Sequence, residues 1–206
     1  MTYLSVSGQI GPAEFAVGGR SAEARADELL ALLQAADTCG YIGEAVSQLE
    51  HALQAAELAR QAGADDETVL AALFHDIGHL CAPEAEGMDG YGTKGHEELG
   101  AVYLSQMGAS ECVAALVRGH VQAKRYLAYK DESYTESLSE ASRQTLQRQG
   151  EAMTAKQAMA FERDPLFSKK LLIRRCDDGA KLRDWKVDGL DAYRPMLVEH
   201  LRAQAA

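Results

Sequence analysis

Several histidines and aspartates occur at positions where they could form a metal site. The stretch LAALFHDIGHL (residues 70–80) places His75, Asp76 and His79 directly after an apolar run. Charged groups rarely occur beside a buried helix unless they are paired or bind a metal. Possible further ligands are distant in the sequence: His51, His96, His120 and Asp177.

Separate helices must converge for these side chains to meet. Along the chain, the steps from His51 to His75, to His96, to His120 and to Asp177 are 24, 21, 24 and 57 residues. Helix bundles build metal sites in this way, from inward side chains on facing helices. Because a carboxylate has two oxygens, Asp76 could bridge two cations while histidines cap each one. Four histidines and two aspartates suit a dinuclear site of iron, manganese or zinc.

The elements that must position these residues are predicted to be helices. The 206 residues are enough for one domain with a sizeable core, and the composition is 47% apolar and 25% charged, with four prolines. No stretch alternates as a strand would. We expect an irregular arm over residues 1–20 and a single all-α domain over residues 21–206.

The apolar spacing predicts where these helices lie. One begins at Ser21 and is broken by residues 38–43, and another is capped by Asp65 or Asp66. A glycine-rich loop is expected over residues 81–95. The remaining helices are expected over residues 44–61, 96–107, 110–129, 131–148, 154–163, 166–184 and 190–204.

Charge and composition narrow the classes of partner. The net charge of −10 argues against nucleic acid or an anionic membrane. No apolar run is long enough to span a membrane, and the N-terminus does not resemble a signal peptide. The four cysteines form no CxxC pair, which predicts reduced thiols and a cytoplasmic protein. The oligomeric state stays open. An anionic small molecule would need a local basic pocket.

Further polar side chains accompany the possible ligands. On one helical face, LIRRCDDGAK offers Arg174, Asp177, Asp178 and Lys181. We interpret Asp177 as a metal ligand, Arg174 as a substrate ligand and Asp178 with Lys181 as a supporting ion pair. The other accompanying residues are Tyr41 and Glu44 ahead of His51, His79 one turn after His75, Lys124 one turn after His120, and Ser142 with Thr145.

The pattern H…HD…H…H…D resembles the HD-domain superfamily, helical metalloproteins that mostly hydrolyse phosphate esters. With the accompanying stretches, the chain from Tyr41 to Lys181 resembles the mixed-valent di-iron HD oxygenases that cleave organophosphonates. The resemblance is strongest to the glycine-forming type, which acts on 2-amino-1-hydroxyethylphosphonate. It implies two iron ions as Fe(II)/Fe(III), O2 as cosubstrate and a small-molecule organophosphonate as substrate.

The resemblance also implies a role for each residue. One iron would be bound by His51, His75 and Asp177, with Asp76 bridging to a second iron on His96 and His120. Tyr41 would occupy the open position of the second iron at rest, and Glu44 would close over the substrate amine. The phosphonate would be held by His79, Lys124, Ser142, Thr145 and Arg174, with Asp178 and Lys181 in support.

Other readings use the same ligands. A trimethylammonium analogue of the substrate would yield glycine betaine, although few aromatic residues near Tyr41 could surround a quaternary ammonium. A dinuclear HD phosphohydrolase would turn over without O2. A regulatory HD domain would not need all six ligands, and a polyol substrate, as in an inositol oxygenase, would not need Lys124 and Arg174.

Overall fold

Helices make up almost all regular structure in the computed structural model, which describes residues 19–38, 40, 44–81, 86–88, 90 and 92–205. Among these residues the only β-type pairings are two isolated bridges, Gly40 with Ser47 and Gly87 with Thr93. The predicted all-α fold is therefore confirmed. The elements are α1 (Ala22–Ala35), η1 (Ala36–Thr38), α2 (Gln48–Gln61), α3 (Asp66–Phe74), α4 (Gly78–Cys81), α5 (His96–Gln106), α6 (Glu111–Lys130), α7 (Glu132–Ser137), α8 (Glu140–Arg148), α9 (Ala155–Phe161), α10 (Phe167–Gly179), η2 (Leu190–Ala192) and α11 (Arg194–Ala203).

Side-chain caps decide where the helices begin. The Ser47 hydroxyl accepts from the backbone N–H of Glu50, while the Glu50 carboxylate accepts from the backbone N–H of Ser47. This capping box starts α2 at Gln48, four residues later than the apolar pattern predicts. Asp65, one of the two predicted caps, caps α3 by accepting from Thr68.

Two further helices differ from the prediction in ways that affect the site. The helix expected over residues 131–148 is divided into α7 and α8, because Leu138 is extended (ψ 144°) and Ser139 caps a new helix. The helix expected over residues 166–184 ends as α10 at Gly179. Lys181 therefore lies beyond the helix and does not continue the face that carries Asp178.

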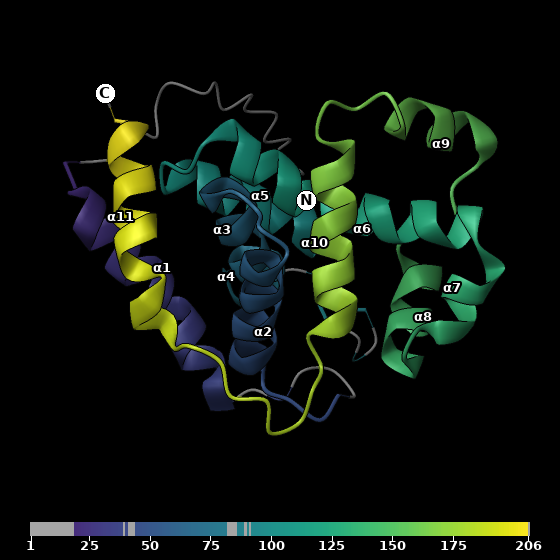
Figure 1. Cartoon of the computed structure of the whole chain (residues 1–206), viewed down its shortest axis with the longest axis horizontal. Coiled ribbons are helices and arrows are strands. Elements are labelled where there is room, and N and C mark those ends of the chain that lie inside the picture. The colour runs from purple at the N-terminus through teal and green to yellow at the C-terminus, as the bar shows by residue number, and fades with distance from the viewer. Residues whose placement is uncertain are drawn as a thin grey trace, which may run out of the picture.

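A central group of helices forms the core (Figure 1). Helix α10 packs against both α2 and α6, while α2 packs on α3 and α5 packs on α6. Helices α1 and α11 lie together on one side, and α7, α8 and α9 lie on the other. The main core contains fully buried side chains from the central helices, including Leu70, Leu116 and Ile173. Residues for chemistry can therefore be placed on inward faces of α2, α6 and α10.

The predicted arm of residues 1–20 lies outside the described residues except for Gly19 and Arg20, so the domain boundary stays a prediction. Within the described part of the chain, no helix combines the length and apolar character that crossing a membrane requires.

Candidate metal centre

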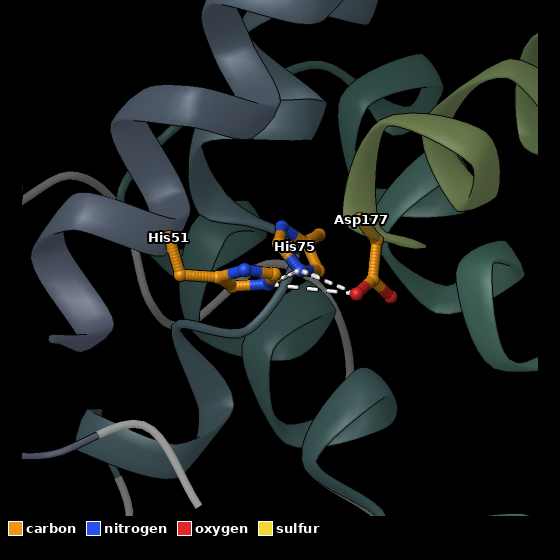
Figure 2. A group of neighbouring side chains, drawn as sticks. All are labelled: His51, His75 and Asp177. Carbon is orange, nitrogen blue, oxygen red and sulfur yellow. Dashed lines mark hydrogen bonds and ion pairs between the residues drawn. The ribbon is translucent and has the colours of Figure 1, made fainter. Parts of the chain in front are cut away.

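Three buried side chains from separate elements form the first cluster (Figure 2). His51 comes from α2, His75 from the turn that ends α3, and Asp177 from α10. The Nε2 atoms of the two histidines lie 3.0 Å apart, and the Asp177 Oδ1 atom lies 3.5 Å from His51 Nε2 and 3.9 Å from His75 Nε2. Two imidazoles and one carboxylate thus face one point.

The second cluster consists of Asp76, His96 and His120. The Nε2 atoms of His96, the first residue of α5, and His120, on α6, lie 3.1 Å apart. Asp76 joins the two clusters, because its Oδ1 atom lies 3.2 Å from His96 Nε2 and its Oδ2 atom lies 3.4 Å from His75 Nε2. The carboxylate is therefore placed as a bridge would be.

The tautomers of the histidines show that these clusters suit cations. The Nδ1 atoms of His51, His75 and His120 lie 2.7, 2.8 and 2.7 Å from the backbone carbonyl oxygens of residues 180, 72 and 117, so each Nδ1 is a donor. A neutral imidazole then has only a lone pair at Nε2. Nε2 atoms about 3 Å apart would repel each other unless a proton or a metal ion lay between them. Two histidines and one carboxylate per cluster are a typical donor set for non-haem iron.

The charges within the site stabilise one another. Burial acts to raise the pKa of Asp177, but the Arg174 guanidinium together with His51 and His75 more than offsets it and holds that pKa well below its usual range. Burial likewise opposes protonation of His75, yet the Asp76 and Asp177 carboxylates and the Ala72 carbonyl together raise the pKa of His75 to about 9. A bound cation would replace that proton, because a histidine ligand must be neutral.

A small polar cavity of about 40 Å³ opens directly over the second cluster. Its described lining contains every residue that the sequence suggests as a substrate ligand, contributed by five different parts of the chain. These lining residues are Glu44, His79, Lys124, Ser142, Thr145 and Arg174, together with Asp76, Met88, His96, His120, Ala141, Gln149, Asp177 and Lys181. The tertiary structure thus brings the expected metal ligands and the expected substrate ligands to one place.

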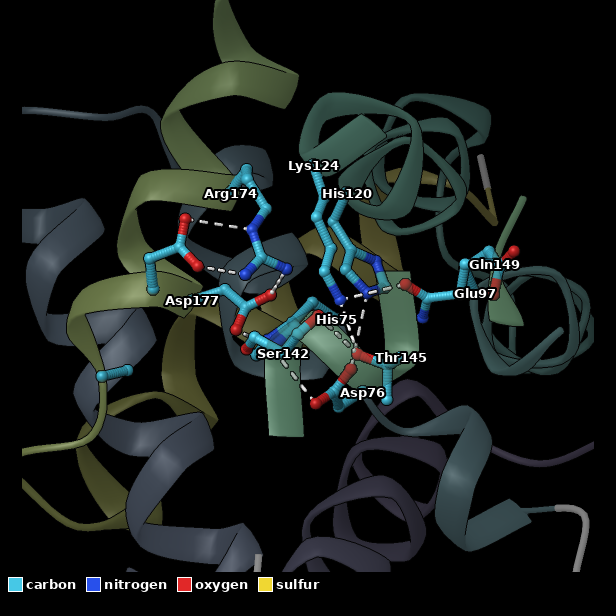
Figure 3. Close-up of polar contacts among 12 residues, drawn as sticks. His75, Asp76, Glu97, His120, Lys124, Ser142, Thr145, Gln149, Arg174 and Asp177 are labelled. Atoms are coloured by element: carbon cyan, nitrogen blue, oxygen red, sulfur yellow. Dashed lines mark hydrogen bonds and ion pairs between the residues drawn. The ribbon is translucent and has the colours of Figure 1, made fainter. Parts of the chain in front are cut away.

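Lys124 reaches from α6 toward α8 on one wall of the cavity (Figure 3). Its ammonium donates to Thr145 Oγ1 at 2.6 Å and to Gln149 Oε1 at 3.0 Å. Burial, assisted by the nearby positive charge of Arg174, lowers the pKa of Lys124 to about 7. Gln149 was not predicted from the sequence. It lies directly after α8, where its backbone N–H donates to the Thr145 carbonyl oxygen one turn earlier.

Lys181 lies at another wall of the cavity and contacts Glu44. Its ammonium donates to Glu44 Oε1 at 2.8 Å, to Ser142 Oγ at 3.0 Å and to Ser139 Oγ at 3.2 Å. The carboxylate that Lys181 contacts here is that of Glu44, and the expected pair of Lys181 with Asp178 stays a prediction. The end of α10 at Gly179 removes Lys181 from the helical face that the sequence suggested.

Arg174 connects the cavity to the candidate ligand Asp177. Its Nη1 donates to Asp177 Oδ2 at 2.6 Å, while its Nε donates to the Tyr134 hydroxyl at 3.0 Å and to Asp178 Oδ2 at 3.1 Å. Asp178 also accepts from Arg174 Nη2 and from the hydroxyl of Tyr134. Arg174 thus orients Asp177, and Tyr134 is a residue of the site that no sequence pattern indicated.

His79 stacks on His96, with ring centroids 4.0 Å apart. Its Nδ1 accepts from the backbone N–H of Thr93 at 3.0 Å, which leaves Nε2 as the donor in the neutral ring. Burial and the neighbouring His96 lower the pKa of His79 to about 3, so it lines the cavity as a neutral donor. Tyr41, the expected resting-state ligand, lies outside the described residues.

Comparisons with known proteins agree with this geometry. The HD domain model matches residues 49–163, more than half of the chain. The chain is 42% identical over 163 residues to an uncharacterized protein of Acanthamoeba polyphaga mimivirus, covering 78% of this chain and 74% of the relative.

Two further relatives have named activities. A hydroxymethylphosphonate dioxygenase of Gimesia maris is 39% identical over 74% of this chain and 77% of its own. A [1-hydroxy-2-(trimethylamino)ethyl]phosphonate dioxygenase (glycine-betaine-forming) of Leisingera caerulea is 37% identical over 76% of this chain and 80% of its own. The matched HD model contains His51, His75, Asp76, His96 and His120 within its span. The chain therefore belongs to the HD-domain family.

Proposed function

We propose that this protein is a di-iron dioxygenase that cleaves the carbon–phosphorus bond of 2-amino-1-hydroxyethylphosphonate, giving glycine and phosphate. The observation that carries the proposal is the pair of clusters sharing Asp76 beneath a cavity lined by Lys124, Ser142 and Thr145. A dinuclear site beside a cation and two hydroxyls suits a small substrate with an anionic phosphorus group. Two relatives named as phosphonate dioxygenases support the same chemistry.

The proposed metal ligands divide between the two clusters. His51, His75 and Asp177 would hold one iron ion, His96 and His120 the other, and Asp76 would bridge them. Imidazole and carboxylate donors suit iron, and no cysteine is part of either cluster. When bound, the two iron ions would supply the one-electron chemistry that use of O2 requires. A resting-state role for Tyr41 stays a prediction.

The phosphonate would bind between α6 and α8. Lys124 supplies a positive charge, and the hydroxyls of Ser142 and Thr145 supply neutral donors. Neutral His79, which also lines the cavity, would add an Nε2–H donor. Gln149 would add a side-chain amide, whose oxygen accepts from Lys124 in this structure. Arg174 lines the same cavity, but its contacts with Asp177 and Asp178 assign it mainly to orienting the metal ligand.

Oxidative cleavage explains why a metal centre of this kind would be needed. The carbon–phosphorus bond of a 1-hydroxyalkylphosphonate has no neighbouring carbonyl group to assist hydrolysis. Addition of one O2 to 2-amino-1-hydroxyethylphosphonate accounts for every atom of glycine and phosphate. The four-electron oxidation of the substrate is balanced by the four-electron reduction of O2. Residues that bind the phosphonate therefore need only hold C1 toward the metal centre.

Glu44 supports a primary amine as the second substrate group. Its carboxylate lines the cavity and already accepts from the primary ammonium of Lys181 at 2.8 Å. A trimethylammonium group has no N–H donor and favours aromatic faces. The Glu44 carboxylate thus offers the acceptor that an N–H donor of a primary ammonium needs. This feature favours the primary amine over the trimethylammonium group.

Hydroxymethylphosphonate is a second candidate substrate. It lacks an amine, so the ion pair of Glu44 with Lys181 could stay intact while it binds. The Gimesia maris relative is named for this substrate.

Phosphate release by the iron-loaded protein, with and without O2, tests the proposal. Release from 2-amino-1-hydroxyethylphosphonate only in the presence of O2, with glycine as the second product, is the expected result. Release without O2 would instead indicate a phosphohydrolase. Assaying hydroxymethylphosphonate and the trimethylammonium analogue in parallel compares the substrates.

The variant Glu44→Gln distinguishes the two leading substrates. If Glu44 binds the amine, KM for 2-amino-1-hydroxyethylphosphonate should rise about tenfold or more, since a charged hydrogen bond contributes about 1.5–3 kcal/mol. KM for hydroxymethylphosphonate should change much less, which makes this substrate the internal control. Equal changes for both substrates would contradict amine recognition by Glu44.

A further inference from the structure

The four histidines of the metal centre differ in the group that contacts Nδ1, the outer ring nitrogen that points away from the metal position. Nδ1 of His51, His75 and His120 each faces a neutral backbone carbonyl at 2.7–2.8 Å. Nδ1 of His96 is buried and has no hydrogen-bond partner among the described residues. The Glu97 Oε2 atom, which can accept a hydrogen bond, lies 3.5 Å from it. His96 is therefore the one member of the set whose outer nitrogen faces a carboxylate.

Among the described residues, the Glu97 carboxylate lacks a hydrogen-bond donor at Oε2, just as His96 Nδ1 lacks an acceptor. Its Oε2 atom is buried and also lacks a hydrogen-bond partner, although the side chain as a whole is 23% exposed. A buried carboxylate oxygen without a donor is costly, and so is a buried N–H without an acceptor. The two unsatisfied atoms face each other, and a closure of about 0.5 Å would bring them to ordinary hydrogen-bond length. Each atom thus supplies what the other lacks.

We propose that Glu97 is a positioning residue for the second metal position: its carboxylate accepts the Nδ1 proton of His96, presents Nε2 to the metal, and lowers the reduction potential of iron bound there. The inference rests on the di-iron centre of the proposed function, but not on its substrate.

The physical reason is the difference between a carboxylate and a carbonyl as acceptor. A carboxylate behind a ligating imidazole fixes its tautomer and raises its basicity. It also adds a negative charge close to the metal, which stabilises the more highly charged ion. In the first cluster, the Nδ1 atoms of His51 and His75 each contact a neutral backbone carbonyl oxygen. The two metal positions should therefore differ in reduction potential, with the ferric state favoured beside His96.

Glu98 offers a matched control. Both glutamates lie in the first turn of α5, so each contributes the same charge to the same helix terminus. Glu98 is 56% exposed and accepts from Arg118 at 2.6 Å on the surface. Substituting Glu98→Gln therefore reproduces the loss of charge at the helix terminus without changing any group in contact with His96.

The test compares the iron-loaded native protein with Glu97→Gln and Glu98→Gln, in the absence of any phosphonate. Iron per chain is measured after dialysis, and reduction potentials are measured by redox titration followed by electron paramagnetic resonance. We expect Glu97→Gln to weaken binding of one iron about tenfold, the lower end for loss of such a partner. If only binding of the ferric ion is weakened, the reduction potential at that position rises by about 59 mV, because a tenfold change in affinity corresponds to 59 mV for a one-electron couple. Glu98→Gln should match the native protein.

Three outcomes are informative. A Glu97→Gln protein that keeps one iron while Glu98→Gln keeps two supports the inference even where no potential can be measured. Equal iron content and equal potentials in both variants would overturn it while leaving the di-iron centre intact. Fewer than two irons in the native protein would overturn the centre and the inference together. Thermal unfolding of each variant, measured without metal, identifies any loss that comes from folding alone.

Discussion

Replacing Gly78 with alanine should disrupt the metal centre through the backbone, without touching any ligand. Gly78 begins α4 and lies against the N-terminal end of α5. A Cβ atom at this position would lie 1.9 Å from the carbonyl oxygen of His96 and 2.9 Å from the backbone nitrogen of Gly100. Since real Cβ contacts are essentially never under 3.0 Å, α4 and α5 would have to separate by about 1 Å.

The expected loss of folding free energy depends on which atoms the new Cβ atom would meet. Overpacking a core costs about 1–3 kcal/mol. The atoms met by Gly78→Ala belong to the backbone, which cannot rotate away as a side chain can, so we expect the upper end, about 3 kcal/mol. For a chain of this size that lowers Tm by roughly 6–12 °C. Asp76 and His96 lie on the two segments that must separate, so a bridging geometry between them would be lost. We expect iron bound at that position to weaken about 10- to 100-fold.

Thermal unfolding and iron content after dialysis measure these two effects. Gly189→Ala is the matched control, because a Cβ atom there meets nothing within 4 Å and its φ of −78° suits any residue. Gly100→Ala should be intermediate, since its closest contacts would be 3.1 and 3.2 Å. A Gly78→Ala protein with the Tm and both irons of the native protein would refute the reasoning.

Three further outcomes are expected. The pKa of Lys124 is lowered to about 7, so its ammonium form is present below that pH, and kcat/KM for a phosphonate should fall as pH rises through about 7. The Lys124→Arg variant stays charged and should flatten this fall. A variant with the same pH profile as the native protein would contradict the assignment. The Asp177→Asn variant should lose one iron while Asp178→Asn keeps two, because of these two residues only Asp177 faces the histidines. Measuring the iron bound per chain tests this, and the reverse result would exchange the roles of the two aspartates. Removing metal with a chelator should lower Tm by roughly 5–10 °C, since a free metal concentration of 100 times Kd stabilises the fold by about 2.7 kcal/mol. An unchanged Tm would show that the clusters do not bind metal in the folded protein.

Much of the site could be predicted from residue types and helical spacing. His75 and Asp76 follow an apolar helical run, and the structure places them in the turn that ends α3. Lys124 lies one turn after His120 on α6, and the two side chains line the same cavity. These relations are local, because 3.6 residues per turn determine which neighbours share a face.

Other relations required the tertiary structure. Arg174, Asp177 and Asp178 lie within five residues, yet only the packing of α10 between α2 and α6 shows that Asp177 faces the histidines. The end of α10 at Gly179 turns Lys181 toward Glu44, a residue 137 positions away. Helical periodicity contains no information about distances of that kind.

The sequence by itself determined the all-α fold class and the types of ligand, because hydrophobic period and donor chemistry are properties of short segments. Only the tertiary structure decided that Asp76 lies between two clusters, that Gly78 must lack a side chain, and that the Nδ1 atom of His96 lies 3.5 Å from the Glu97 carboxylate. Each of these depends on how closely α4, α5 and α6 approach one another. That approach is decided by the packing of side chains from distant parts of the chain.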